Sequence, residues 1–266
     1  MNKFVLIASA RTGSTLLMGL LASSPEISVF YELFHPHTLK LPAGLKQWDV
    51  AAELARRETA PLEWLGSILA TASKPVSGFK IFDGHNGEVL RYLIREPSIR
   101  KIVLFRENFL AVHSSVLISA KKAVWSSQLK ASVEIGNHDP AAYEWTETIT
   151  FERDVFEKRW RRYLSYYDEV TTQLVNVNQY YMFMEYAELL NEQLVRRAFP
   201  FLGAAQPESL RSDMSKNNTS SLLDRFNNPD AVYAYLKEIN KLDWLTESFW
   251  IWKSEDGGKL DRQICP

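Results

Sequence analysis

The sequence predicts an α/β domain in which a central parallel β-sheet lies between two layers of helices. Three observations lead to this fold class. Short β-rich runs alternate with stretches of helical spacing, the 266 residues suit one such domain, and 46% apolar residues can form a large core. In sheets of this kind ligands bind beyond the carboxyl ends of the strands, so we expect site residues directly after them.

The individual elements follow from runs of apolar residues. Five runs are predicted to be strands: Phe4–Ala8, Ile27–Phe30, Val76–Phe82, Lys101–Phe105 and Tyr180–Met184. Helical spacing is found in Leu16–Leu21 and Leu189–Phe199, and Asn227-Asn228-Pro229-Asp230 indicates a turn followed by a helix start. Because strands and helices alternate, the sheet is predicted to be parallel and covered on both faces.

We predict one domain over residues 1–266, because the sequence contains no internal repeat, low-complexity tract or flexible linker. The segment Ala120–Arg162 differs from the rest, since it mixes scattered aromatic and charged residues with the breakers Gly136 and Asp139-Pro140. Two interpretations of this segment stay open. It is either an insertion or lid on the acceptor side of the site, or an ordinary helical pair that packs on the sheet.

The overall charge and the single cysteine exclude several kinds of protein. The net charge is −1 without a long run of one sign, so bulk attraction to nucleic acid or to an acidic membrane is not expected. Cys265 is the only cysteine, which excludes an internal disulfide and a cysteine metal cage. No leader pattern and no apolar run of about 18 residues occurs, so we expect a cytoplasmic protein without a transmembrane segment. The oligomeric state stays open.

The segment FVLIASARTGSTLLMGLL places a short loop between the first strand and the first helix. Backbone N–H groups and the positive end of the helix dipole converge in such a loop, and Ser14 and Thr15 add hydroxyl donors. Gly13 allows the backbone to approach a bound oxyanion closely. These features predict a P-loop-like anion site. The alternative is a tight turn in which Thr12 or Ser14 caps the helix.

The loop departs from the Walker A pattern GxxxxGK[ST] of nucleoside triphosphatases. Ser14 follows the glycine where that pattern has lysine, and Ala8 stands at the place of the first glycine. The main positive clamp on a triphosphate is therefore missing, and the positive charge comes from Arg11 instead. The sequence favours a different anion.

RTGSTLL resembles the 5′-phosphosulfate loop of the sulfotransferases that use 3′-phosphoadenosine 5′-phosphosulfate (PAPS), written loosely as [KR]-[ST]-G-[ST]-[ST]-x-L. MSKNNTSSLLDRFNNPDAV resembles a segment of the bacterial carbohydrate sulfotransferases, the group that contains nodulation-factor and trehalose enzymes. The resemblance spans most of Phe4–Leu236 and is vague across Ala120–Arg162. It implies that Arg11 and the backbone from Thr12 to Thr15 hold the 5′-phosphate and the sulfuryl group.

The resemblance also implies a site for the 3′-phosphate of PAPS. The family has an arginine at a strand end and a serine eight positions later, and here Arg106 follows KIVLF while Ser114 stands eight positions on. The alternatives are an ion pair of Arg106 with Glu107 or another carboxylate, and an ordinary helical serine at Ser114. Tyr186, in MFMEYAELL, is expected near the adenine, and Lys216 is expected to reach the 3′-phosphate. A core tyrosine and a surface lysine are the alternatives for these two.

Sulfuryl transfer needs positive charge on the sulfonate and the leaving phosphate, and a base for the proton of the acceptor hydroxyl. Arg11 and Lys80 are our candidates for the charge. Lys80 stands in SGFKIF, where many members of the family resembled have a lysine that touches the sulfuryl group, and a solvated lysine at a strand edge is the alternative. Animal cytosolic sulfotransferases have a histidine two residues after this lysine, but this sequence has Phe82 there. Carbohydrate-type enzymes have a glutamate after the first helix and second strand, so the resemblance makes Glu32 the predicted base. A helix-capping or salt-bridged glutamate is the alternative.

Asp83, His85 and His35 are the alternative bases. His35-Pro36-His37 has no third ligand at a sensible spacing, so no metal is expected. The predicted function is transfer of a sulfuryl group from PAPS to a hydroxyl of a small acceptor, a carbohydrate or glycolipid, with adenosine 3′,5′-bisphosphate as the other product. Two rivals stay open: a small-molecule phosphotransferase with an altered loop, and a non-catalytic nucleotide-binding relative.

Overall fold

The computed structural model describes residues 2–36, 39, 48–132, 148–212, 221–246, 249–250 and 262–263. The chain divides into two compact units, which are described separately. The first comprises Met1–Glu107, Tyr163–Ser215 and Trp250–Asp261, and the second comprises Asn108–Arg162, Lys216–Phe249 and Arg262–Pro266. One domain with a lid over 120–162 stays a prediction, and residues 133–147 of that segment lie outside the described residues.

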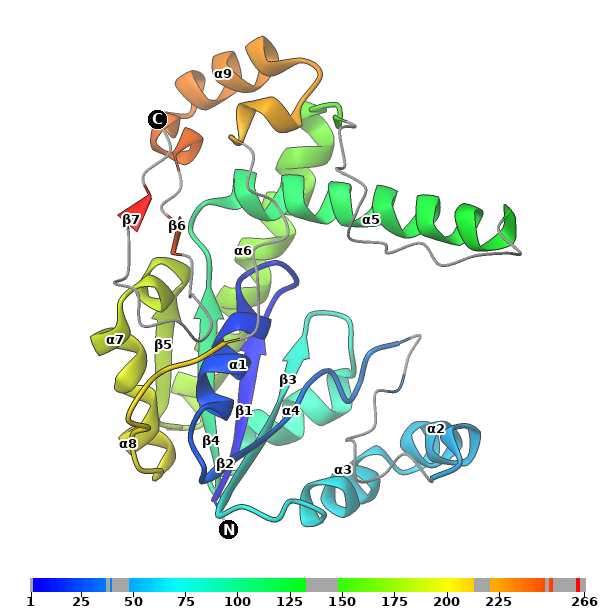
Figure 1. Cartoon of the computed structure of the whole chain (residues 1–266), viewed down its shortest axis with the longest axis vertical. Helices are drawn as coiled ribbons and strands as arrows, with labels where there is room; N and C mark the ends of the chain where they lie inside the picture. The colour runs from blue at the N-terminus through cyan, green and yellow to red at the C-terminus, as the bar shows by residue number, and fades with distance from the viewer. Residues whose placement is uncertain are drawn as a thin grey trace. The chain divides into compact units, whose positions relative to one another are not determined.

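A five-stranded parallel sheet forms the centre of the first unit (Figure 1). Its strands are β1 (Asn2–Ala8), β2 (Ile27–Phe30), β3 (Val76–Phe82), β4 (Ile99–Phe105) and β5 (Tyr181–Glu185), arranged in the order β2-β3-β1-β4-β5. Every neighbouring pair is parallel. The five predicted strands and the parallel α/β fold are therefore confirmed.

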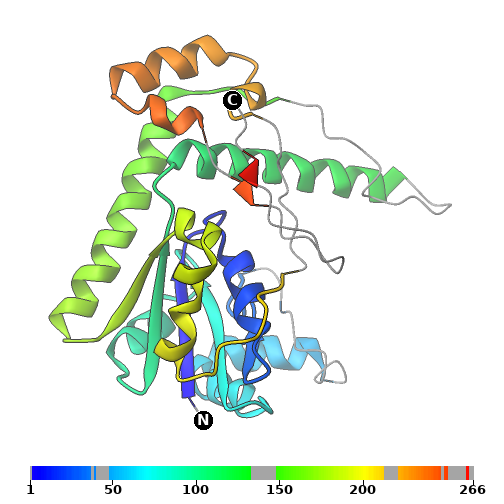
Figure 2. The same ribbon diagram turned by 60° about the vertical axis from the view of Figure 1, so that its left-hand side comes forward.

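Helices cover both faces of this sheet, which completes the predicted three layers (Figures 1 and 2). On one face α1 (Ser14–Ala22), α7 (Glu192–Arg196) and α8 (Ala198–Leu202) share an apolar cluster with Phe4, Leu6 and Ala8 of β1. On the other face lie α3 (Pro61–Ala70), α4 (Gly87–Arg95) and the part of α6 (Arg153–Asn176) that belongs to the first unit. There Phe34 packs against Trp64 of α3 and Phe79 of β3, and Tyr167 of α6 packs against Phe105 of β4.

Polar side chains fix several helix boundaries in the first unit. The carboxylate of Asp49 caps α2 (Val50–Thr59) by accepting from the N–H groups of Ala51 and Ala52, at 2.9 and 3.3 Å. The predicted helix over Leu189–Phe199 is divided into the 3₁₀ helix η3 (Tyr186–Leu190), α7 and α8. The break lies at Asn191, whose backbone is extended and whose side chain caps α7. Asparagine prefers this capping position to a helix interior.

The second unit has an aromatic core. It contains α5 (Phe109–Ser132), the first part of α6, η4 (Leu223–Arg225), α9 (Pro229–Glu238) and η5 (Leu242–Leu245). The rings of Phe109, Phe151 and Tyr235 lie 5.2, 5.4 and 5.5 Å from that of Phe156, which is fully buried. The helix start predicted at Pro229 is confirmed.

The chain also contains the two-residue strands β6 (Phe249–Trp250) and β7 (Arg262–Gln263). Within the described residues, no helix combines the length and the apolar character that a membrane crossing requires.

Candidate active site

The loop between β1 and α1 has two residues in the left-handed region of backbone space. Arg11 has φ 67° and Gly13 has φ 85°. The hydroxyl of the buried Thr12 donates to the carbonyl of Ser9 at 2.8 Å, which ties the loop to its own start. Among the described residues, no side chain caps α1, so neither Thr12 nor Ser14 is a helix cap. The N–H groups of the first turn of α1 are directed at the loop, as an anion site requires.

Arg106, directly after β4, and Tyr186, the first residue of η3 after β5, brace this loop. A Cβ atom added to Gly13 would lie 2.6 Å from the ring of Tyr186, so only glycine allows this close packing. The guanidinium of Arg106 stacks on the same ring, with Cζ 4.0 Å from its centroid. Its Nη1 donates to the carbonyl of Arg11 at 2.7 Å. The hydroxyl of Tyr163 holds the backbone of Arg106: it accepts from the N–H of Arg106 at 3.0 Å and donates to its carbonyl at 2.9 Å. Both predicted nucleotide residues of β4 and η3 thus lie against the predicted loop.

Lys80, near the end of β3, reaches the head of α1. Its ammonium donates to the hydroxyl of Thr15 at 2.7 Å and lies 3.5 Å from that of Ser14. It also forms an ion pair with Glu32, whose carboxylate oxygen is 2.9 Å away. Lys80 is only 2% exposed, and its charge lies 5.1 Å from the ring centroid of Phe82. A lysine in this position is fixed as a point charge at the predicted sulfonate site.

Glu32 follows β2 and faces Lys80. Burial tends to raise the pKa of Glu32, but the charge of Lys80 and its hydrogen bond oppose this, with further help from His85 and His35. The pKa therefore lies below its ordinary value, and Glu32 is a carboxylate at neutral pH. Burial and the charge of Arg106 lower the pKa of Arg11, while Glu32 opposes them. Arg11 still remains a cation, because arginine does not lose its proton in proteins.

His85 is held neutral. Burial is the main cause that lowers its pKa to about 4, and the charge of Glu32 counteracts it only in part. Its Nδ1 accepts the backbone N–H of Phe82 at 3.3 Å, which assigns the proton of the neutral ring to Nε2. In this tautomer Nε2 is a donor and does not accept a proton. Among the candidate bases, this favours the carboxylate of Glu32 over His85.

A pocket of about 390 Å³ brings the predicted catalytic residues together. All the candidate bases line it, and so do both candidate charges. Its lining consists of Ala10, Arg11, Ser14, Thr15, Glu32, His35, Pro36, Lys80, Phe82, Asp83, Gly84 and His85. The pocket therefore combines cations and hydroxyl donors with two carboxylates, Glu32 and Asp83, in one cavity of the size that small ligands use.

Arg57 of α2 supports the segment that carries the candidate bases. It is buried, and its Nη1 donates to the carbonyls of Leu33 and His35 at 3.0 and 3.1 Å. It is also paired with Glu58 at 2.8 Å. Sequence reasoning missed Arg57, because nothing local shows that α2 folds back onto the chain after β2.

In the second unit, Ser114 lies next to a buried arginine that the sequence analysis did not consider. Nη1 of Arg225 donates to the hydroxyl of Ser114 at 3.0 Å, and this hydroxyl lies 3.2 Å from the carbonyl of Ala111. Both side chains are buried. Arg225 stands in the segment LLDRF that carries the family resemblance, which was the one available signal. Arg106 belongs to the first unit, so its cooperation with Ser114 stays a prediction.

Two further predictions concern Lys216 and metals. Lys216 lies outside the described residues. Within the described part of the chain, no cluster of three or more histidine, cysteine, aspartate or glutamate residues could hold a metal ion.

Among the comparisons with known proteins, matches come from solved structures. No family model matches the chain, and no curated protein matches it. Among solved structures, the chain is similar to a sulfotransferase from Alicyclobacillus acidocaldarius, with 16% sequence identity and a TM-score of 0.49 over 92% of this chain and 94% of that chain. Values this low leave the function to be argued from the residues of the site.

Proposed function

We propose that this protein transfers a sulfuryl group from PAPS to a hydroxyl of a small acceptor, a carbohydrate or glycolipid. The observation that carries the proposal is the charge arrangement in the 390 Å³ pocket. There Lys80 contacts both the hydroxyl of Thr15 at the head of α1 and the carboxylate of Glu32, at 2.7 and 2.9 Å. An anion site and a proton acceptor thus lie within reach of one cation.

The chemistry of the donors suits a sulfonate. Ser14 replaces the lysine of a triphosphate loop, and the cations of the pocket are Arg11 and Lys80. A sulfonate carries less negative charge than a terminal phosphate. Two cations, two hydroxyls and the N–H groups of the first turn of α1 therefore suffice to bind it. In this proposal Arg11 and the loop residues Thr12–Thr15 hold the 5′-phosphosulfate.

During the reaction, the bond between sulfur and the acceptor oxygen forms while the bond between sulfur and the 5′-phosphate oxygen breaks. The acceptor proton passes to the carboxylate of Glu32, which is ionised at neutral pH and therefore able to accept it. Negative charge grows on the leaving phosphate, where Arg11 and Lys80 stabilise it. Positioning and electrostatics supply the catalysis in such a loose transition state.

The ion pair between Lys80 and Glu32 couples binding of the sulfonate to the basicity of Glu32. Lys80 lowers the pKa of Glu32, so Glu32 is a weak base while the pair is intact. A sulfonate beside Lys80 gives the ammonium a second anionic partner and weakens its hold on Glu32. The basicity of Glu32 then rises when the sulfuryl group is in place.

For the other end of PAPS we assign four residues. Arg106 and Ser114 hold the 3′-phosphate with Lys216, and Tyr186 lies near the adenine. Support comes from the stacking of Arg106 on Tyr186 at 4.0 Å and from the buried arginine beside Ser114. Arg225 adds a positive charge to this set.

Calorimetric titration tests the nucleotide part of the proposal. Adenosine 3′,5′-bisphosphate is expected to bind without magnesium, whereas ATP with magnesium is expected to bind at least about tenfold more weakly, because the loop lacks the triphosphate lysine. Arg11→Ala should abolish bisphosphate binding. The reverse order of affinities would favour a phosphotransferase and overturn the proposal.

A transfer assay tests the catalytic part. Sulfur-labelled PAPS is incubated with a pool of hydroxyl acceptors, and label should appear in an acceptor with the wild-type protein. Glu32→Gln should lower the rate by about 10²–10⁴-fold, the usual contribution of a general base, and leave bisphosphate affinity within about twofold. Nucleotide binding without turnover in any pool would assign a non-catalytic binding role instead.

A further inference from the structure

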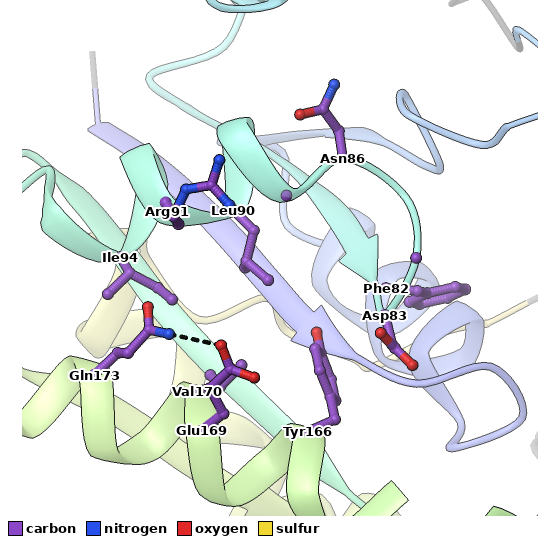
Figure 3. A pocket seen from close by; sticks show the side chains of 12 residues that line it. Phe82, Asp83, Asn86, Leu90, Arg91, Ile94, Tyr166, Glu169, Val170 and Gln173 are labelled. Atoms are coloured by element: carbon purple, nitrogen blue, oxygen red, sulfur yellow. Dashed lines mark hydrogen bonds between the residues drawn. The ribbon is translucent and has the colours of Figure 1, made fainter. Parts of the chain in front are cut away.

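A second pocket, of about 270 Å³, lies between α4 and α6 on the other side of the turn that follows β3 (Figure 3). It shares Phe82, Asp83 and Gly84 with the first pocket. Gly84 has φ 79°, and a Cβ atom added there would meet no atom within 4 Å. The divide between the two pockets is therefore a short turn with no side chain at Gly84.

The wall of the second pocket contains a polar group that the fold leaves unpaired. The hydroxyl of Tyr166 is buried and has no hydrogen-bond partner among the described residues. Figure 3 shows the ring rising from α6 toward the turn at Asp83. Burial is the main cause that raises the pKa of Tyr166, so the hydroxyl keeps its proton and stays a donor. A buried, unpaired hydroxyl is costly, and a ligand that accepts from it removes this cost.

The remaining lining identifies the class of ligand. The carboxylates of Asp83 and Glu169 accept hydrogen bonds, and Arg91 and Gln173 donate them. Gln173 is already oriented by its bond to Glu169 at 2.9 Å. Because two carboxylates and only one guanidinium line the pocket, an anionic ligand is disfavoured there. A purely apolar ligand would leave the hydroxyl of Tyr166 unpaired, whereas hydroxyl groups both donate and accept. Leu90 adds an apolar surface for the face of a ring.

We propose that the second pocket binds the non-reacting ring of a neutral glycoside acceptor of at least two sugar rings. The acceptor hydroxyl enters the first pocket, and the chain of rings crosses the Gly84 turn. This inference rests on the proposed function for the identity of the reacting end, but the sugar site itself can be measured without turnover.

Ligand-observed saturation-transfer NMR tests the site directly. The probe is a pool of four neutral disaccharides: maltose, cellobiose, lactose and sucrose. Leu90→Trp fills the second pocket and leaves the first one untouched, because Leu90 lines only the second. The matched control is Leu164→Trp, on an exposed part of α6 outside both pockets. We expect Leu90→Trp to reduce the disaccharide signal at least about tenfold and the control to retain it.

Tyr166→Phe provides a second variant that cannot act by unfolding the protein. The lost hydroxyl makes no hydrogen bond to a described residue, so thermal stability should be unchanged or higher. Disaccharide affinity should fall about fivefold, the value of one hydrogen bond. No signal from the pool with the wild-type protein, or equal signals from wild type and Leu90→Trp, would overturn the sugar site. Failure of the proposed function is read separately, from the titration with adenosine 3′,5′-bisphosphate.

Discussion

Lys80→Met separates the charge of Lys80 from its packing. Methionine keeps most of the volume but removes the ammonium, which leaves the carboxylate of Glu32 without its cation. The side chain of Lys80 is 2% exposed and that of Glu32 is 27% exposed. Removing one partner of a buried ion pair costs about 3–5 kcal/mol, while an exposed pair contributes about 0–1 kcal/mol. For this half-buried pair we expect the free energy of unfolding at neutral pH to fall by about 2–3 kcal/mol.

The stability difference between wild type and Lys80→Met depends on pH, because it depends on the protonation of Glu32. In the wild type the pKa of Glu32 is lowered, so its contribution to stability is present above the unfolded pKa and is lost as the pH falls through the folded pKa. Without Lys80, burial is the largest remaining influence and raises the pKa of Glu32. Protonation of Glu32 then removes the unpaired charge, and the variant regains part of its lost free energy of unfolding. The stability difference between wild type and Lys80→Met should therefore shrink from pH ~7 to pH ~4.

Urea unfolding followed by tryptophan fluorescence measures this difference at both pH values. The double variant Lys80→Met/Glu32→Gln removes the orphaned carboxylate and should recover about 1–2 kcal/mol at neutral pH. Lys101→Met is the matched control, because Lys101 is another buried lysine but donates to the carbonyl of Glu96 and the amide of Gln179. A loss that is equal at both pH values, and that Glu32→Gln does not relieve, would refute the electrostatic reasoning.

Three further predictions concern the two ends of the nucleotide and the base. Gly13→Ala should lower the free energy of unfolding by more than about 1–2 kcal/mol, because φ 85° is unfavourable for alanine and the new Cβ meets Tyr186 at 2.6 Å; thermal denaturation checks this. Arg225→Met should weaken binding of adenosine 3′,5′-bisphosphate about tenfold in calorimetry, because the hydroxyl of Ser114 loses its charged donor. In stopped assays at a series of pH values, kcat/KM should stay constant as the pH falls, until the pH is below the ordinary glutamate pKa of 4.5. A fall of kcat/KM that begins above pH 4.5 on acidification would contradict Glu32 as the base.

Features encoded by neighbouring residues could be predicted from the sequence. The strands are short apolar runs between polar turns, so their positions followed from the pattern and were confirmed. The loop after β1 was predicted from Gly13 and the apolar residues on either side of it. The structure gives the reason for the glycine, since no Cβ fits beside Tyr186. The sequence alone also shows that Ser14 stands where a triphosphate loop has lysine.

Features that depend on tertiary packing could not be predicted. The pairing of Arg225 with Ser114 joins residues 111 positions apart, and no local pattern encodes such a pair. Arg57 reaches the carbonyls of Leu33 and His35 only because α2 folds back on them. The neutral state of His85 depends on its burial and on the backbone N–H of Phe82, which the one-dimensional pattern does not reveal.

The strand order explains why the candidate site forms where it does. Because β1 lies between β3 and β4, the loop that follows it is reached from both sides. From β3, Lys80 approaches the hydroxyls of the first turn of α1, and from β4, Arg106 approaches the carbonyl of Arg11. β2 lies on the far side of β3, and the backbone N–H of Lys80 donates to the carbonyl of Tyr31 at 3.1 Å. In this register Tyr31 lies beside Lys80, and Glu32 follows just beyond the end of β2, where its carboxylate reaches the ammonium of Lys80 at 2.9 Å. A slip of β2 by one residue would shift Glu32 by about 3.3 Å along the strand direction relative to Lys80 and separate the base from its cation.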